Sequence, residues 1–298
     1  MIEMTDIRDI DSLQAVLLMV VFLQSSSRMS MCYSYVGIAL SASVRMGLHR
    51  KLPETRFNHI EREIRKRIFW TCWKMDTYVG ALLGLPKGIA IEDIDQDQPA
   101  EVDDQYITEE KIEPQPEGEL SSMVAMNAHT RLLFVMAKTV KYIYPLKGIE
   151  SSVTGAGDGY TVNQSKVHEI EMDLVAWLES LPAELRPGDG APKMFLKYAE
   201  HAVDGYSSTK TNKDLRCQYL LRMSFAHVQM ILYRPFVHYL TRPKTLGCDE
   251  RPYVIARACV QVARKIVHTA DEMRKHGILN GAYWVRANPR CRRWNRQF

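Results

Sequence analysis

The chain has 298 residues, 46% hydrophobic and 25% charged, which excludes a disordered protein and leaves room for one large domain or two small ones. The net charge of +4 comes from five arginines among the last thirteen residues. The remainder carries −1 and lacks the excess expected of a phosphate-binding surface. The longest apolar run, Leu13 to Leu23, is too short for a bilayer span of about 20 residues, and the segment before it is too acidic for a secretory signal. We therefore expect an intracellular protein without a membrane partner.

The first 50 residues predict two helices. Residues 10–24 are rich in leucine, valine and methionine and read as a buried helix, and a second helix is expected from about 31 to 48. Apolar residues recur along the second segment at the spacing of one helical face: Tyr35, Ala39, Ala42 and Met46. Gly47 stands where a helix-ending glycine can adopt a positive φ, and Pro53 prevents continuation.

The strongest helical pattern runs from about 58 to 83. An apolar stripe with steps of three and four residues comprises Ile64, Ile68, Cys72, Met75, Val79 and Leu82. Trp70 and Trp73 widen this surface, which predicts that the helix is covered on two sides. Glu61 and Glu63 suit the positive end of the helix dipole. Asp76 is the anomaly, since Arg65 and Arg67 lack the spacing to reach it, and a buried carboxylate would need a partner from elsewhere.

Residues 92–119 hold twelve carboxylates against one lysine and read as a solvated acidic loop without a packed core. Further helices are expected at 120–144, 163–180, 214–233 and 252–275, with a flexible linker at 147–162. No segment shows strand alternation joined by hairpin turns. The predicted fold is all-α, a large multi-helix bundle.

No motif nominates a reaction. The six cysteines never stand at C-x-x-C spacing, and the nine histidines form no metal-ligand pair, so we expect no catalytic, cofactor-binding or metal-binding residue in this chain. Nine basic side chains gather around the second and third helices: Arg45, His49, Arg50, Lys51, Arg56, Arg62, Arg65, Lys66 and Arg67. We interpret them as a solvated helix face, with phosphate contact as the alternative, and the acidic loop could cover them.

An ordered series of motifs carries a resemblance to one family. It begins with residues 42–50 (ASVRMGLHR) and 61–76 (EREIRKRIFWTCWKMD), and continues with 83–86 (LGLP), 91–95 (IEDID) and the YRPF at 233–236. The series resembles the fungal-specific transcription factor domain, also called the middle homology or xylanolytic-activator regulatory domain, over about Leu13 to Val285.

The resemblance implies a helical regulatory domain, spanning residues 1–285, of a nuclear transcription factor, with no enzymatic activity. Its implied partners are the transcriptional machinery or corepressor proteins, and a small-molecule effector. It assigns a structural or regulatory role to the residues matching family motifs: Arg45, Gly47, Leu48, His49, Arg50, Arg65, Arg67, Trp70, Asp76, Gly84 and Pro86.

Two departures from the family accompany the resemblance. Full-length relatives bind DNA through a zinc cluster of close C-x-x-C pairs, which this sequence lacks, so we expect zinc and DNA contact only in a module before Met1. The arginine-rich tail at 286–298 does not resemble the family, and we expect a domain incomplete at both ends, from a truncated or mispredicted gene product. The alternative function is a helical interaction scaffold unrelated to transcription. A third possibility is an enzyme whose active site no sequence motif reveals.

Overall fold

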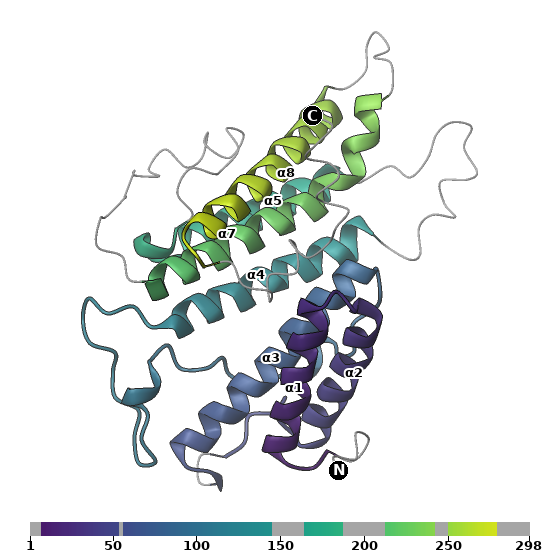
Figure 1. The fold of residues 1–298 in the computed structure, drawn as a ribbon. Helices are drawn as coiled ribbons and strands as arrows, with labels where there is room; N and C mark the ends of the chain where they lie inside the picture. Colours follow the sequence, from purple (N-terminus) through teal and green to yellow (C-terminus); the bar gives the residue numbers. More distant parts are fainter. Residues whose placement is uncertain (1–6, 54–55, 145–163, 187–211, 242–249, 279–298) are drawn as a thin grey trace. The chain divides into compact units, whose positions relative to one another are not determined.

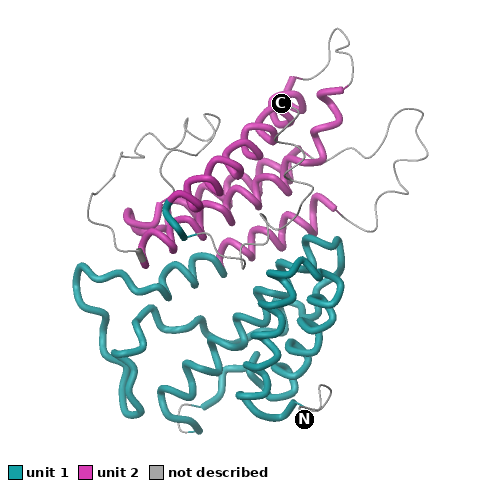
Figure 2. Tube along the Cα trace, viewed as in Figure 1, with its two compact units in different colours: residues 1–130, 276–298 teal, residues 131–275 magenta. Residues whose placement is uncertain are grey.

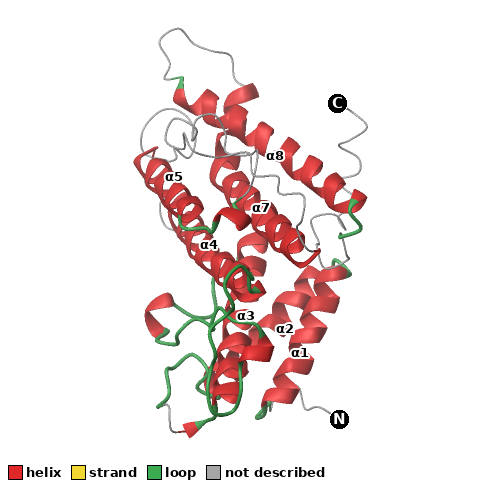
Figure 3. Cartoon of the chain, turned by 90° about the vertical axis from the view of Figure 1, so that its left-hand side faces the viewer, coloured by secondary structure: helices red, strands yellow, loops and turns green. Residues whose placement is uncertain are grey.

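The computed structural model describes residues 7–53, 56–144, 164–186, 212–241 and 250–278. Within these ranges the regular elements are all helical, with one isolated antiparallel bridge between Ile107 and Ile112 (Figures 1 and 3). The predicted all-α fold is thereby confirmed. The predicted linker at 147–162 and the arginine-rich tail at 286–298 lie outside the described residues, and the boundary at 285 stays a prediction.

The chain divides into two compact units, residues 1–130 with 276–298 and residues 131–275 (Figure 2). Unit 1 begins with a helical hairpin, α1 (Ile10–Ser25) and α2 (Met29–Arg45). The Asp9 side chain caps α1 by accepting a hydrogen bond from the Ser12 N–H at 2.7 Å. The tight turn between the helices places Ser27 at φ 60°, a left-handed conformation that is rare for a residue with a Cβ.

The longest helix of unit 1, α3 (His59–Leu83), completes the packing of α1 and α2. Its start is capped by the Asn58 side chain, which accepts from the Glu61 N–H at 2.8 Å. One buried cluster joins residues of all three helices: Val20, Leu23, Cys32, Val36 and Val79. Phe69 and Trp73 are fully buried on α3 as well, so the prediction that this helix is covered on two sides is confirmed.

The acidic segment after α3 exposes most of its carboxylates, as its charge predicts, but its backbone is anchored. It contains two short 3-10 turns, η2 (Ile91–Asp93) and η3 (Asp104–Tyr106), and Pro99 is buried. Many of its carboxylates are exposed, but its backbone is fastened to α3 and to α4 (Ser122–Ile143). The exposed carboxylates agree with the predicted solvated loop, but the anchoring of the backbone was not predicted, because composition reports side chains, whereas backbone amides and carbonyls make these contacts.

The boundary between the units falls within α4, and unit 2 begins at Arg131 of this helix. Its other elements are α5 (Gln164–Glu179), η5 (Ala183–Leu185), α7 (Asn212–Tyr233), η6 (Arg234–Thr241) and α8 (Arg251–Lys275). Trp177 of α5 stacks on Phe225 of α7 with ring centroids 5.5 Å apart, and Lys138 of α4 pairs with Asp173 of α5 at 2.6 Å. The predicted helix ends were correct to within about two residues, except that α2 ends three residues before the predicted end at 48 and that a 3-10 helix continues through Pro235. None of the described helices combines the length and apolarity that a membrane span requires.

Candidate functional site

Most of the family-motif residues lie along α3 and the two chain segments beside it. The first of these segments follows α2. Gly47, at φ 70°, closes that helix, and the next N–H, that of Leu48, reaches back to the Ser43 carbonyl at 2.9 Å. This is the pattern of a Schellman ending, in which a glycine takes the left-handed position. The turn buries Leu48 completely and directs the chain along α3.

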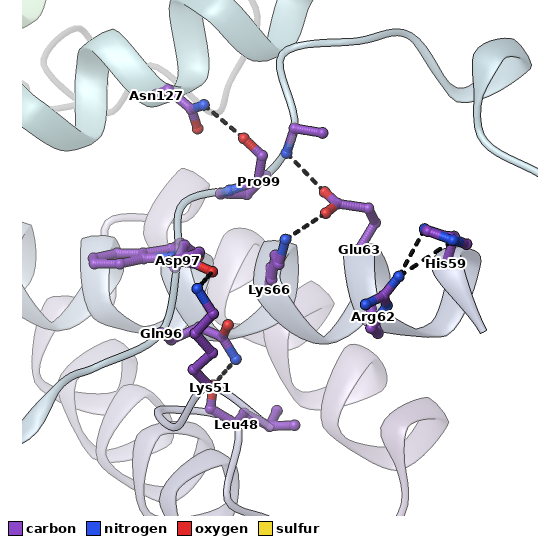
Figure 4. Close-up of polar contacts among 12 residues, drawn as sticks. Leu48, Lys51, His59, Arg62, Glu63, Lys66, Gln96, Asp97, Pro99 and Asn127 are labelled. Carbon is purple, nitrogen blue, oxygen red and sulfur yellow. Dashed lines mark hydrogen bonds and ion pairs between the residues drawn. The ribbon is translucent and has the colours of Figure 1, made fainter. Parts of the chain in front are cut away.

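The second segment, residues 94–104, is held by α3 through backbone groups, and we name it the docked segment. Glu63 is only 2% exposed, and its Oε2 accepts a hydrogen bond from the Ala100 N–H at 2.8 Å (Figure 4). Trp70 donates from Nε1 to the Asp97 carbonyl at 2.8 Å. From α4, the Asn127 amide donates to the Pro99 carbonyl at 2.8 Å. Two helices therefore fix the path of a segment that has no regular secondary structure before Asp104, the first residue of η3.

Gln96 joins the docked segment to the chain after α2, and no sequence pattern pointed to this residue. Its Nε2 donates to the carbonyls of Leu48 and Arg50, both at 2.9 Å. The His49 carbonyl accepts from the N–H groups of Asp95 and Gln96 at 3.2 and 3.1 Å. The linking role of Gln96 is visible only in these hydrogen bonds, because an isolated glutamine in an acidic stretch has no recognisable spacing.

The basic side chains of the site face different partners. Arg65 donates from Nη2 to the Met46 carbonyl at 3.0 Å, tying α3 to the end of α2. Two acids of the segment contact two cations as the covering hypothesis expected: Asp97 pairs with Lys51 at 2.7 Å, and Asp104 pairs with Arg67. The acidic segment thus neutralises part of the basic cluster.

Asp76, in the second half of α3, holds the chain turn that follows this helix. It is 3% exposed, and its Oδ2 accepts from the Gly88 N–H at 2.9 Å. Burial raises the pKa of Asp76, while the Gly88 N–H and the nearby Lys87 oppose that rise. Burial lowers the pKa of Lys87 to about 8, and its ammonium lies 5.1 Å from the Trp73 ring centre. The expectation that a buried Asp76 finds its partner outside the arginine run is confirmed.

Gly84 and Pro86 shape the turn that brings Gly88 to Asp76. Gly84 ends α3 at φ 69°, and the Leu85 N–H returns to the Gly80 carbonyl at 2.9 Å. The Pro86 carbonyl accepts from the Tyr33 hydroxyl of α2 at 3.4 Å. A side chain at Gly88 would place its Cβ 2.6 Å from Leu40 Cδ2, so any larger residue at this position would force the Leu40 side chain to move.

The side chains of two motif residues lie apart from these contacts. Arg45 reaches back to the carbonyl of Ile7 at 3.3 Å, on the side of the N-terminal segment. The exposed Arg50 contributes its carbonyl to Gln96, and its Nε donates to the neighbouring His49 ring at 3.3 Å. The structure therefore gathers nine of the eleven motif residues around α3 and its flanking turns, and it places the side chains of these two at the periphery.

The arrangement is suited to holding chain segments in place. Glu63 and Asp76 accept hydrogen bonds from backbone N–H groups, while Asp97 and Asp104 neutralise cations. Among the described residues no group of three or more histidine, cysteine, aspartate or glutamate side chains is placed to hold a metal ion. Burial raises the pKa of the Cys32 thiol to about 11 and that of Cys72 to about 12, which disfavours the thiolate that zinc binding needs.

Comparison with known proteins supplies the context for this site. A family model described as the fungal specific transcription factor domain matches residues 4–179. The chain is 38% identical over 287 residues to "Activator of stress genes 1" of Saccharomyces cerevisiae, covering 95% of this chain and 27% of that protein. It is 36% identical to "Activator of stress genes protein 1" of Candida albicans, covering 95% of this chain and 29% of the relative.

A more distant relative is "Transcriptional activator protein acu-15" of Neurospora crassa, 29% identical over 70% of this chain and 20% of the relative. The chain thus spans between a fifth and a third of the length of these three relatives. No solved structure matches the chain.

Proposed function

Since the chain belongs to the fungal-specific transcription factor domain family, we propose that it serves as the regulatory part of a transcription factor that acts in the nucleus. The relatives whose printed names describe activators and transcriptional regulators support this role over a scaffold unrelated to transcription. The observation that carries the proposal is the double attachment of the docked segment, to Glu63 and Trp70 of α3 and to Asn127 of α4.

This attachment is the kind of element that regulation requires. A segment fastened by a few specific hydrogen bonds can be held or released as a unit, and a partner protein or small effector that binds one state better shifts the balance between them. The partners that we propose are proteins of the transcriptional machinery or corepressors, and the carboxylates and arginines of the site act by positioning chain segments instead of by catalysis.

DNA contact and zinc belong, in this proposal, to another module of the longer relatives. Structural zinc sites of this type need cysteine thiolates in close pairs. The six cysteines of this sequence contain no C-x-x-C pair. The residues present therefore do not fit the zinc cluster, and no step of the proposed function passes through a metal in this chain.

The test is to fuse the chain to an unrelated DNA-binding domain and to measure a reporter gene in yeast. At matched protein levels we expect a change in reporter output of at least several-fold relative to the DNA-binding domain alone. Glu63→Ala, which releases Ala100, should alter that output, whereas Glu61→Ala on the same helix should not. Identical output from the fusion and from the bare DNA-binding domain would contradict the proposal.

A further inference from the structure

The helical hairpin that opens unit 1 is almost free of charge. Residues 12–44, which include nearly all of α1 and α2, contain a single charged side chain, that of Arg28 in the turn between the helices. The two helices lie side by side and share a buried cluster with α3 (Figure 1). The outer side of the hairpin therefore lacks the charged residues that usually cover a surface helix of a globular protein.

α1 is apolar on both of its sides. Its inner side buries four aliphatic side chains: Leu13, Val16, Val20 and Leu23. Its outer side exposes two large apolar side chains one turn apart, Leu18, which is 72% exposed, and Phe22, which is 65% exposed. These are the highest exposed fractions among the large hydrophobic residues of the described chain. Because a helix that is apolar all round is normally covered all round, this outer side has the character of an interface core.

Opposite charges stand at the two ends of this apolar side. Asp11 precedes Leu18 by about two helical turns and therefore lies on the same side of α1. Arg28 follows directly after the α1–α2 turn. Both side chains are exposed, and neither takes part in an ion pair within the described part of the chain. Arg8 and Asp9, beside Asp11, offset one another in formal charge, so Asp11 sets the sign of that end.

We propose that α1 is the contact surface of a symmetric dimer, in which it packs antiparallel against α1 of a second copy of this chain. The spacing of the residues defines the register. The midpoint between Asp11 and Arg28 coincides, to within one residue, with the midpoint between Leu18 and Phe22. An antiparallel pair that sets Asp11 against the second copy's Arg28 therefore also sets Leu18 against the second copy's Phe22. The two-fold axis repeats each contact.

This pattern favours a second copy over other occupants. A parallel pair would set Asp11 against Asp11 and Arg28 against Arg28, and like charges would oppose it. A strongly charged partner helix would lose the hydration of its side chains against an uncharged surface. A membrane surface attracts helices that carry several lysines or arginines on their polar side, and this hairpin carries only Arg28. The antiparallel copy matches both the apolar side and its charged ends.

The contact is small, so the dimer is reversible. Each copy contributes two large apolar anchors at the centre, an aliphatic and an aromatic side chain, with polar or charged residues at both ends. Interfaces that bury less than about 1,200 Å² are typical of transient complexes. We therefore expect a dissociation constant of about 10–100 μM.

Sedimentation equilibrium of the purified 298-residue chain, at concentrations from about tenfold below to about tenfold above this range, tests the proposal. We expect a monomer–dimer equilibrium. Leu18→Ser and Phe22→Ser should each raise Kd roughly tenfold or more, because the symmetry removes each anchor twice. The matched control is Val267→Ser, which removes an apolar side chain of α8 that is 53% exposed and should leave Kd unchanged.

Exchange of the end charges tests the antiparallel register. Arg28→Glu and Asp11→Arg should each raise Kd by about three- to tenfold, because two opposite-charge contacts become like-charge contacts. The two variants change the net charge in opposite directions, so a general charge effect would not weaken both. The double variant Asp11→Arg/Arg28→Glu restores the opposite-charge contacts and should return Kd to within about threefold of the wild-type value.

Three results would overturn the proposal: a chain that stays monomeric throughout, a dimer that Leu18→Ser and Phe22→Ser leave unchanged, and single charge variants that the double variant does not rescue. Circular dichroism checks that each variant is folded, and if a serine variant is not, the charge variants still decide the outcome. The dimer does not depend on the proposed function. A fusion without regulatory activity would leave the dimer unaffected, and a monomeric chain would leave the reporter result unaffected.

Discussion

Replacing Glu63 with alanine should release the docked segment and destabilise unit 1. Glu63 is almost completely buried, and its two carboxylate oxygens serve different partners: Oε2 accepts from the Ala100 N–H at 2.8 Å, and Oε1 contacts Lys66 Nζ at 2.8 Å. The alanine variant removes both acceptors at once. It leaves the Ala100 N–H and the partly exposed Lys66 ammonium without this carboxylate acceptor.

The magnitude follows from the two contacts. A hydrogen bond from a backbone N–H to a charged carboxylate contributes about 1.5–3 kcal/mol. The Lys66 side chain retains 23% exposure, so its pair with Glu63 is discounted for solvent screening to at most about 1 kcal/mol. The expected decrease in the free energy of unfolding is therefore about 2–4 kcal/mol, below the 3–5 kcal/mol typical of breaking a fully buried pair.

Urea denaturation followed by circular dichroism measures the decrease, and amide hydrogen exchange at Ala100 localises it. The control is Glu61→Ala, two residues earlier on α3, where an exposed carboxylate interacts with the helix dipole, about 0.3–1 kcal/mol, and with the charge of Arg65. A decrease below 1 kcal/mol for Glu63→Ala, together with unchanged exchange of the Ala100 amide, would refute the assigned role of this carboxylate.

Three further changes test other parts of the structure. Gly88→Ala places a Cβ 2.6 Å from Leu40 Cδ2, so we expect a loss of about 1–3 kcal/mol in urea unfolding, and a stability within 0.5 kcal/mol of wild type would contradict the close approach. Ser27→Gly relieves the left-handed backbone of the α1–α2 turn and should raise stability by about 0.5–1 kcal/mol, measured as a higher urea midpoint with unchanged slope. Burial lowers the pKa of His227 to about 4 from its usual 6.5. The unfolded chain therefore binds more protons between these values, and wild type loses up to about 3 kcal/mol as the pH falls from 6.5 to 4. His227→Asn should show a shallower loss across the same window, and equal slopes for the two proteins would argue against a neutral buried imidazole.

The helices were predictable because their signals are local. The periodic stripe of α3 recurs every three or four residues, and Gly47 and Gly84 stand within two residues of the helix ends, where left-handed endings occur. The candidate site was predictable only as a set of family motifs. Gln96 was missed, and Glu63 was assigned to the helix dipole when it instead holds the Ala100 N–H, because a hydrogen bond between residues 37 positions apart leaves no spacing to read.

Sequence alone thus determined the helical class, the ends of most helices and the family, since each of these depends on neighbours along the chain or on ordered motifs. Only the tertiary structure determined which contacts the acidic segment and the basic cluster make. Charge composition predicted a solvated loop and a solvated helix face, yet folding fastened the loop through its backbone and gathered four of the cations around one cavity. The physical reason is that composition indicates how unfavourable it is to bury a set of side chains. Which backbone group finds a hydrogen-bond partner, and which charges come close together, is decided only when segments distant in the sequence meet.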